Sequence, residues 1–268
     1  MGRFSKLETQ TRKAAAAVQD VPAPEQGAEP LTFDGMMREA DLRFHGGDYV
    51  KALRWYSQAL SEDNTRQEPW VGQVFALLFQ SQYREATVWA QRAVTVFPND
   101  PLILSLHGLV FAMQGMAKRG LATSDYGMSQ GSTDPRCWVA RGWILLESEN
   151  ENWRMCFARA ADVAQADQWR VHMLMGLILE RYRKWVNAIE HYEAAVNQHT
   201  GSFFLWHRLG VCQARLGLAR KAFEAQEHAL NLKPGYAPAE RELRRLGGFP
   251  IGAMFAWIRN IFSRPKPQ

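Results

Sequence analysis

Small residues in this chain recur at a fixed spacing of 34 positions, and this period limits the possible folds more than any other feature. One column holds Ala40, Val74, Gly108, Gly142, Gly176 and Gly210. A second holds Ala52, Ala86, Gly120, Arg154, Ala188 and Ala222, and a third holds Ala59, Ala93, Gly127, Ala161, Ala195 and Ala229. A small residue at the same place in nearly every copy indicates two helices that pack too closely for a longer side chain.

Each copy has the pattern of two helices joined by a short turn. From Leu31 onward apolar residues recur at helical spacing, and no strand-like alternation appears. Turn signals fall midway through copies, as in "GGD" (46–48), and at their ends, as in "FPNDP" (97–101). The sequence therefore predicts an all-α protein: a right-handed α-solenoid of about six helix-turn-helix repeats.

These repeats resemble the tetratricopeptide repeat family, whose period and residue types they share. The second repeat carries the resemblance in Trp70, Tyr83, Ala86, Ala93 and Pro98. The sixth carries it in Trp206, Leu209, Gly210, Gly217, Ala222, Ala229 and Pro234. The resemblance covers about residues 33–234. It implies a solenoid that binds other proteins, and it does not specify which partner, because the family binds many unrelated ones.

The chain divides into four segments. Residues 1–31 are expected to be a flexible segment and linker, because "VPAPEQGAEP" (21–30) is rich in Pro, Glu and Ala. Residues 32–234 hold the six repeats. Residues 235–247 are expected to form a more polar capping helix over the last repeat, as solenoid ends require. Residues 248–268 form an amphipathic, basic C-terminal segment.

Residues 251–262 have one strongly apolar side when drawn as a helix. Its docking residues are Met254, Phe255, Trp257, Ile258, Ile261 and Phe262. A helix of this length is about 18 Å long, too short to cross a bilayer. Arg259, Arg264 and Lys266 suit anionic lipid headgroups. We expect docking on a membrane surface or a partner, with two alternatives: a second cap on the last repeat, or a tail that fills the chain's own groove.

Positive charge is concentrated toward the C-terminus. Residues 201–268 hold eleven Lys or Arg and four Asp or Glu, a net charge of +7, against +5 for the whole chain. This distribution favours an acidic partner or a membrane surface there over nucleic-acid binding along the whole chain. Cys137, Cys156 and Cys212 show no CxxC spacing. The sequence predicts a cytoplasmic protein, with a peripheral position at the inner face of a membrane as the alternative.

No catalytic or cofactor-binding pattern is found in the sequence. Neither GxxxxGK[ST] nor GxGxxG occurs, and there is no HExxH. His191 and His199 could share a helix face, but no third metal ligand is evident. Cys212 and His207 should lie about 140° apart on one helix, so they should not form a nucleophile–base pair. We expect no enzyme activity, no metal and no cofactor.

A partner-binding groove is implied by the family resemblance, in which the first helices of successive repeats line the concave surface. Carried over to this chain, its residues are Phe75, Leu78, Phe79, Leu109, Met113, Trp143, Leu146, Arg170, Arg181, His207, Arg208 and Arg215. These groove residues are apolar in repeats two to four and increasingly basic in repeats five and six. It predicts a peptide or helix that is apolar at one end and acidic at the other. The alternative is that neighbouring helices or the tail bury these side chains as ordinary core.

The leading functional hypothesis is a non-catalytic adaptor or scaffold that binds a peptide or helix of a partner protein. A membrane-associated scaffold, tethered by residues 251–262, is the alternative, and an RNA-binding helical repeat ranks last. The family's carboxylate clamp needs Lys and Asn at positions occupied here by Met37, Asp41 and Gly72, so that mode is not favoured. The sequence leaves the partner and the oligomeric state open.

Overall fold

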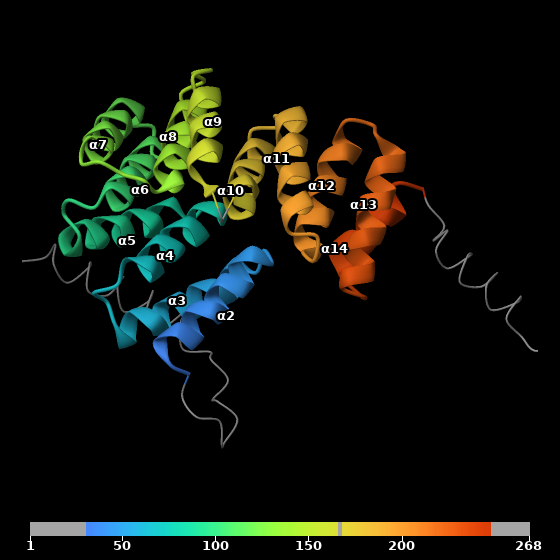
Figure 1. Cartoon of the computed structure of the whole chain (residues 1–268), viewed down its shortest axis with the longest axis horizontal. Helices are drawn as coiled ribbons and strands as arrows, with labels where there is room; N and C mark the ends of the chain where they lie inside the picture. Colours follow the sequence, from blue (N-terminus) through green and yellow to red (C-terminus); the bar gives the residue numbers. More distant parts are fainter. Residues whose placement is uncertain (1–30, 166–167, 248–268) are drawn as a thin grey trace, which may run out of the picture.

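The computed structural model describes residues 31–165 and 168–247, which contain thirteen helices and no strand. The predicted all-α repeat solenoid is confirmed, with six helix pairs followed by one terminal helix (Figure 1). The first helices of the pairs are α2 (Phe33–His45), α4 (Gln67–Phe79), α6 (Pro101–Ala112), α8 (Pro135–Glu147), α10 (Gln168–Arg181) and α12 (Phe203–Arg215). The second helices are α3 (Tyr49–Glu62), α5 (Tyr83–Val96), α7 (Ala117–Ser129), α9 (Trp153–Val163), α11 (Trp185–Gln198) and α13 (Ala219–Leu232). Helix α14 (Ala237–Arg245) packs against α13 and α12.

The starts of the first helices follow the repeat. Thr32, Asp100, Asp134 and Ser202 occupy N-cap positions separated by 34 or 68 residues, and each accepts a hydrogen bond from a backbone N–H of the first turn. A side-chain oxygen at this position satisfies one of the N–H groups that a helix start leaves without a partner. Proline follows the cap in α6 and α8, where its missing N–H costs nothing.

The turn inside every pair contains one residue in the left-handed backbone region, again every 34 positions. These residues are Gly47, Ser81, Gly115, Glu149, Arg183 and Gly217. In each turn the next residue donates its N–H to the carbonyl five positions earlier, as in Asp48 to Arg43 (2.8 Å) and Leu218 to Gln213 (3.0 Å). This is the Schellman arrangement, which ends a helix and reverses the chain. The six turns therefore share one geometry.

The small-residue columns lie where the sequence predicts close helix contacts. A Cβ added to Gly108 would come within 2.5 Å of the Gly120 carbonyl oxygen, so α6 and α7 touch through their backbones. The fourth repeat departs from the columns. Helix α9 begins at Trp153 and buries Phe157 and Ala160, whereas Arg154 is exposed and Ala161 is only half-buried. The turn before α9 is longer than the turns within the other pairs. The buried face of α9 is therefore shifted by one residue relative to the columns.

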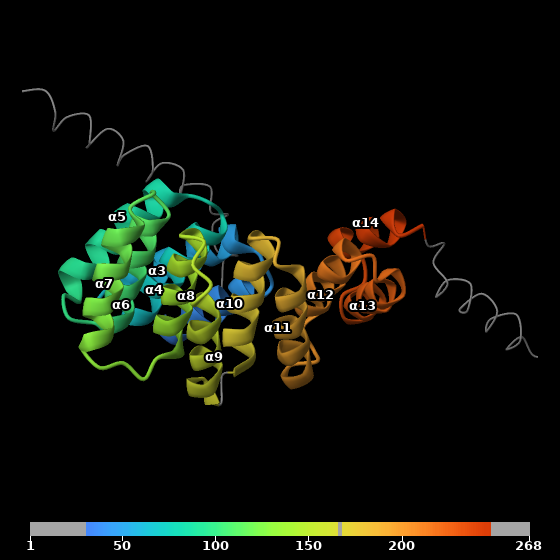
Figure 2. The ribbon, with the colours of Figure 1, turned by 90° about the horizontal axis from the view of Figure 1, so that it is seen from above.

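The solenoid curves strongly enough that its first repeat returns to its later repeats. Two perpendicular views both place α2 beside α10 (Figure 1, Figure 2). The ring of His45, at the end of α2, meets the ring of Trp169 on α10 with centroids 5.0 Å apart. The concave side is therefore partly filled by the chain itself.

Candidate partner-binding site

Most apolar residues that the sequence places in the groove are buried in the structure. Phe75, Leu78, Leu109, Met113, Trp143, Leu146 and His207 are buried, and Phe79 is half-buried. The reason is the curvature: α4 contacts α6, α6 contacts α8, and α8 contacts α10 directly. Side chains on the inner faces of these helices therefore pack on one another.

The basic end of the expected groove is largely occupied by intramolecular partners. Arg208 forms a two-pronged ion pair with Glu180, in which the distance from Nε to the carboxylate is 2.9 Å. Burial alone would lower the pKa of Arg208, but Tyr192 and Glu180 hold it above its usual value. Arg181 donates to the hydroxyls of Ser81, at 3.2 Å, and Tyr83. Arg215, which belongs to the same basic end of the expected groove, is exposed and has no ion pair with a described residue.

The C-terminal docking residues Met254, Phe255, Trp257, Ile258, Ile261 and Phe262 lie outside the described residues. Arg170, by contrast, lines an open cleft on the concave side.

This cleft has a volume of about 660 Å³ and lies between the first two repeats and the starts of α8 and α10. Its apolar wall consists of Met37, Phe44, Val71, Phe75, Val171 and Leu174. Gly72 belongs to the same wall, and a Cβ there would overlap the ring of Tyr56. The size is in the range of sites that hold a drug-sized molecule or a few peptide residues.

The charges around the cleft balance. Three arginines, Arg66, Arg136 and Arg170, face three carboxylates, Asp41, Glu68 and Asp134. Several of these groups already have partners: Arg66 bonds to Asp34 at 3.0 Å and to Glu68 at 3.4 Å. The hydroxyl of Tyr56 donates to Asp41 at 2.8 Å. The cleft is thus polar at its rim but carries no net charge.

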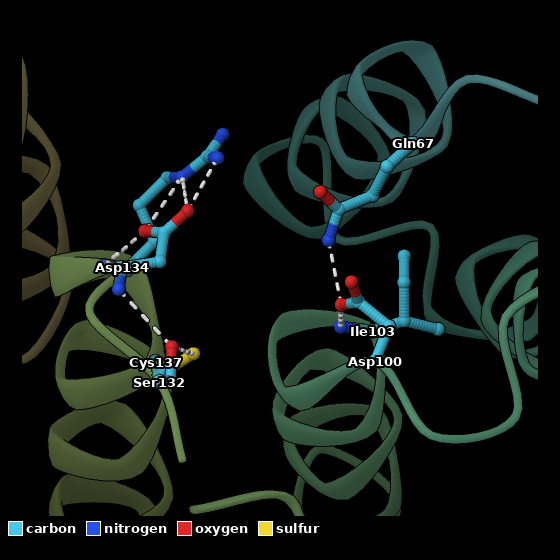
Figure 3. Close-up of polar contacts among 7 residues, drawn as sticks. Gln67, Asp100, Ile103, Ser132, Asp134 and Cys137 are labelled. Atoms are coloured by element: carbon cyan, nitrogen blue, oxygen red, sulfur yellow. Dashed lines mark hydrogen bonds and ion pairs between the residues drawn. The ribbon is translucent and has the colours of Figure 1, made fainter. Parts of the chain in front are cut away.

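Two polar contacts fix helix starts near the cleft, one between neighbouring repeats and one within the fourth repeat. Figure 3 shows Gln67, at the start of α4, pointing to Asp100, at the start of α6. The Gln67 amide donates to Asp100 at 2.6 Å, while the same carboxylate accepts from the Ile103 N–H. Asp134 accepts from the Arg136 side chain at 3.0 Å and caps α8 (Figure 3). Burial alone would lower the pKa of Arg136, but Asp134 holds it above its usual value.

His45 borders the cleft on the side of the first repeat. Burial, followed by the charges of Arg170 and His199, lowers the pKa of His45 to about 3. The ring is therefore neutral at ordinary pH and packs edge-on against Trp169. The ring of His199 stacks on Trp169 as well, at 4.4 Å.

Sequence reasoning identifies some cleft residues and misses others. It singles out Met37, Asp41 and Gly72 only as unsuitable for a carboxylate clamp, and they do lie in the cleft. It misses Thr133, Asp134 and Arg136, because "STDP" (132–135) indicates a turn when taken alone. The Asp-Pro pair in that signal predicts a capped helix start. In the structure this helix start lies at the cleft.

The described residues contain no group of three or more His, Cys, Asp or Glu side chains that could hold a metal ion. His191 bonds instead to His172, with 2.9 Å between their Nδ1 atoms, and burial followed by the charge of His172 lowers the pKa of His191 to about 4. The three cysteines are buried and free. Burial raises the pKa of the Cys137 thiol to about 11. No helix in the described ranges is both long and apolar enough to cross a bilayer.

Comparison with known proteins gives matches in structure only. No protein-family model and no curated protein matches the sequence. A solved structure of a monomeric IFIT1 mutant with Gppp-AAAA is similar over 92% of this chain and 59% of its own, with 16% identity and a TM-score of 0.55. TTC0263, a thermophilic TPR protein of Thermus thermophilus, matches 68% of this chain and 100% of its own, with 15% identity and a TM-score of 0.49. A tetratricopeptide repeat protein from Parabacteroides merdae matches 91% of this chain and 94% of its own, with 13% identity and a TM-score of 0.48.

At these identities the likeness concerns the fold alone. The fold itself is documented by the chain: helix pairs repeat every 34 residues, small residues lie at the close contacts, and one turn geometry recurs in all six pairs. The described part of this chain is an all-α solenoid of helix pairs whose 34-residue period resembles that of tetratricopeptide repeats.

Proposed function

We propose that this protein is a non-catalytic adaptor that binds a peptide or helix of a partner protein on its concave side. The observation that carries the proposal is the cleft of about 660 Å³ between the first two repeats and the starts of α8 and α10. It combines an apolar wall with a rim of fixed polar groups, which is the usual composition of a site that recognises a segment of another molecule.

The balance of charge around the cleft indicates the chemistry of the bound segment. Three arginines are matched by three carboxylates, so neither a strongly acidic nor a strongly basic segment gains from long-range attraction. We propose a segment of low net charge that places an aliphatic or aromatic side chain against Val71, Phe75 and Leu174. The sequence-based expectation of an acidic end then applies only to the surface near Arg215.

Nucleic acid is a less suitable ligand for this cleft. The IFIT1 structure contains Gppp-AAAA, a ligand with a phosphate chain. Binding a phosphate chain draws its affinity from cations that lack carboxylate partners. In this chain the cations of the cleft are balanced by Asp41, Glu68 and Asp134. A peptide is therefore the ligand that the cleft favours.

Selection from a displayed peptide library on the full-length protein tests this function. Thr133 is exposed at the rim of the cleft, so Thr133→Trp should fill the opening. Thr95, exposed on α5 away from the cleft, gives the matched control Thr95→Trp. Selected peptides should lose about tenfold or more in affinity to the first variant and little to the second. Peptides that bind both variants equally would show that the partner binds elsewhere.

A further inference from the structure

The turn between α2 and α3 occupies part of the concave side formed by repeats five and six. A Cβ added to Gly47 would overlap the ring of Phe204, and one added to Gly46 would lie 3.7 Å from Cζ of Phe203. His45 meets Trp169 in the same region. A segment of the first repeat thus lies directly against aromatic side chains more than 120 positions later in the chain.

Aromatic rings continue this contact into the second and fourth repeats. Tyr49 packs against Phe44, with centroids 5.3 Å apart, and stacks on Phe79 at 5.5 Å. Phe79 in turn meets Trp143 of α8 at 5.3 Å. The hydrogen bonds from Arg181 to Ser81 and Tyr83 close the same gap from the side of α10. The two ends of the solenoid are joined through aromatic contacts and a few polar ones.

One buried polar group in this contact has no hydrogen-bond partner among the described residues. This group is the hydroxyl of Tyr49. It lies in the field of Arg208 and Glu180, which already bond to each other. A buried hydroxyl without a partner weakens the contact that buries it. The neutral ring of His45 is likewise held beside the cationic Arg170.

We propose that residues 45–49, "HGGDY", are an intramolecular occupant of a docking surface made by Trp169, Phe203, Phe204 and the Glu180–Arg208 pair. The partner that fits this surface is a protein segment with two aromatic side chains flanking a small-residue turn at the end of a helix. This inference rests on the proposed peptide-binding function and specifies the chemistry of the peptide. The partner's segment replaces the chain's own turn. The cleft adjoins this surface at His45, which meets Trp169, and at Arg170.

The chain's own turn and a free partner segment compete for the same docking surface. A tethered occupant is present at a high effective concentration, so a free segment binds weakly until the occupant leaves. The apparent affinity is lowered by the fraction of molecules whose surface is free. A change that expels the turn without altering the surface should therefore increase the affinity for a segment of the same chemistry.

The chain offers a matched pair of variants for this test. Gly47→Ala adds a methyl group that overlaps Phe204 at a left-handed position, with φ of 76°. Gly115→Ala places the same methyl group at the equivalent turn of the third repeat, with φ of 81°, where nothing lies within 4 Å. The two variants carry the same backbone strain. Only the first acts on the contact with repeats five and six.

The experiment uses full-length protein, small-angle X-ray scattering, and a fluorescent synthetic peptide of residues 41–52. Gly47→Ala should increase the radius of gyration, and it should bind the peptide about tenfold or more tightly than wild type, because the tethered competitor is removed. Gly115→Ala should match wild type in both measurements. A peptide with Ala in place of His45 and Tyr49 should not bind, because His45 supplies the ring that meets Trp169.

Two results would overturn the inference. If Gly47→Ala remains as compact as wild type, the turn is a fixed part of the fold and not an exchangeable occupant. If the variant expands but does not bind the peptide, the surface does not recognise this chemistry. Either result leaves the proposed function standing as long as library peptides still depend on the cleft through Thr133→Trp. The absence of such peptides would instead remove the proposed function.

Discussion

At the residue scale, the six left-handed turn residues form the most regular feature of the molecule, and half of them are not glycine. Ser81, Glu149 and Arg183 adopt φ values of 62°, 55° and 57°. A side chain with a Cβ is strained in this region by about 1–2 kcal/mol. The repeat therefore imposes its turn geometry even where the local residue opposes it.

Replacing Glu149 by glycine should raise the free energy of unfolding by about 1 kcal/mol, because relief of strain exceeds the added flexibility of the unfolded chain. Glu193 is exposed within α11 and gives a control of the opposite sign. Glu193→Gly should lower the free energy of unfolding by about 1 kcal/mol, since glycine is a poor helix former. Urea unfolding monitored by circular dichroism measures both. A loss of stability in both variants would mean that the turn at Glu149 is not strained.

The same residues show what a sequence can and cannot predict here. The columns of small residues identify the helix pairs, because only a small side chain fits where two helices pack closely. The turn column is hidden, because Ser81, Glu149 and Arg183 give no glycine signal. The one-residue rotation of α9 is hidden as well, since Ala160 and Ala161 are both small and only the structure shows which one is buried.

At the element scale, the sequence predicts that the inner faces of the first helices bind a partner, and these faces mostly pack on each other. Sequence patterns fix which face of a helix is apolar, but the angle between successive pairs decides whether that face is covered. Many side-chain contacts together determine that angle, so no single sequence pattern predicts it. The cleft residues that the sequence misses, Thr133, Asp134 and Arg136, lie at a helix start, where the sequence signal is a cap and not a periodic pattern.

The ion pair between α10 and α12 illustrates the consequence for mutagenesis. The side chains of Glu180 and Arg208 are only 10% and 29% exposed. Arg208→Ala should cost about 3 kcal/mol of stability, because it leaves a buried carboxylate without its main partner. Arg215, which is exposed on the same helix, should lose no more than about 0.5 kcal/mol when replaced by alanine. Equal melting temperatures for the two variants would show that the ion pair contributes little to the fold.

The segment 251–262 is an element that only the sequence predicts. If it docks on membranes, full-length protein should float with vesicles that contain anionic lipid, and a chain ending at Leu246 should not. Binding should weaken as salt is added, because Arg259, Arg264 and Lys266 interact with charged headgroups. Vesicles of neutral lipid are the control. An intact protein that never floats, together with a truncated one that melts much lower, would make this segment a structural cap.

At the scale of the whole molecule, the solenoid is a curved chain of repeats whose ends meet through a small contact. Helix pairs in such folds mainly touch their neighbours, so a contact between distant repeats is held by few residues. Here those residues include a histidine beside an arginine. The overall curvature should therefore respond to protonation more than the stability of any single repeat.

Acid should open this contact. The pKa of His45 is about 3 when the ring is packed against Trp169, against 6.5 for a free histidine. A histidine with a lowered pKa stabilises the closed form fully above pH 6.5, and this stabilisation is lost as the pH falls toward 3. The groups that face it are Arg170 on α10 and His199 after α11, and both disfavour a second positive charge. The radius of gyration of wild type should therefore increase as the pH falls from about 6.5 toward about 3.

His45→Phe should remove most of this change, because it keeps a ring against Trp169 and cannot be protonated. His228→Phe is the matched control, since His228 is exposed and its ring stacks on Trp206 at 4.5 Å and not on a residue of the first repeat. Scattering curves of the two variants across the same pH range decide the matter. If the control loses the transition, or if His45→Phe retains it in full, the opening is driven by another titrating group. The His172–His191 pair would then be the next to replace, because the pKa of His191 is also lowered, to about 4.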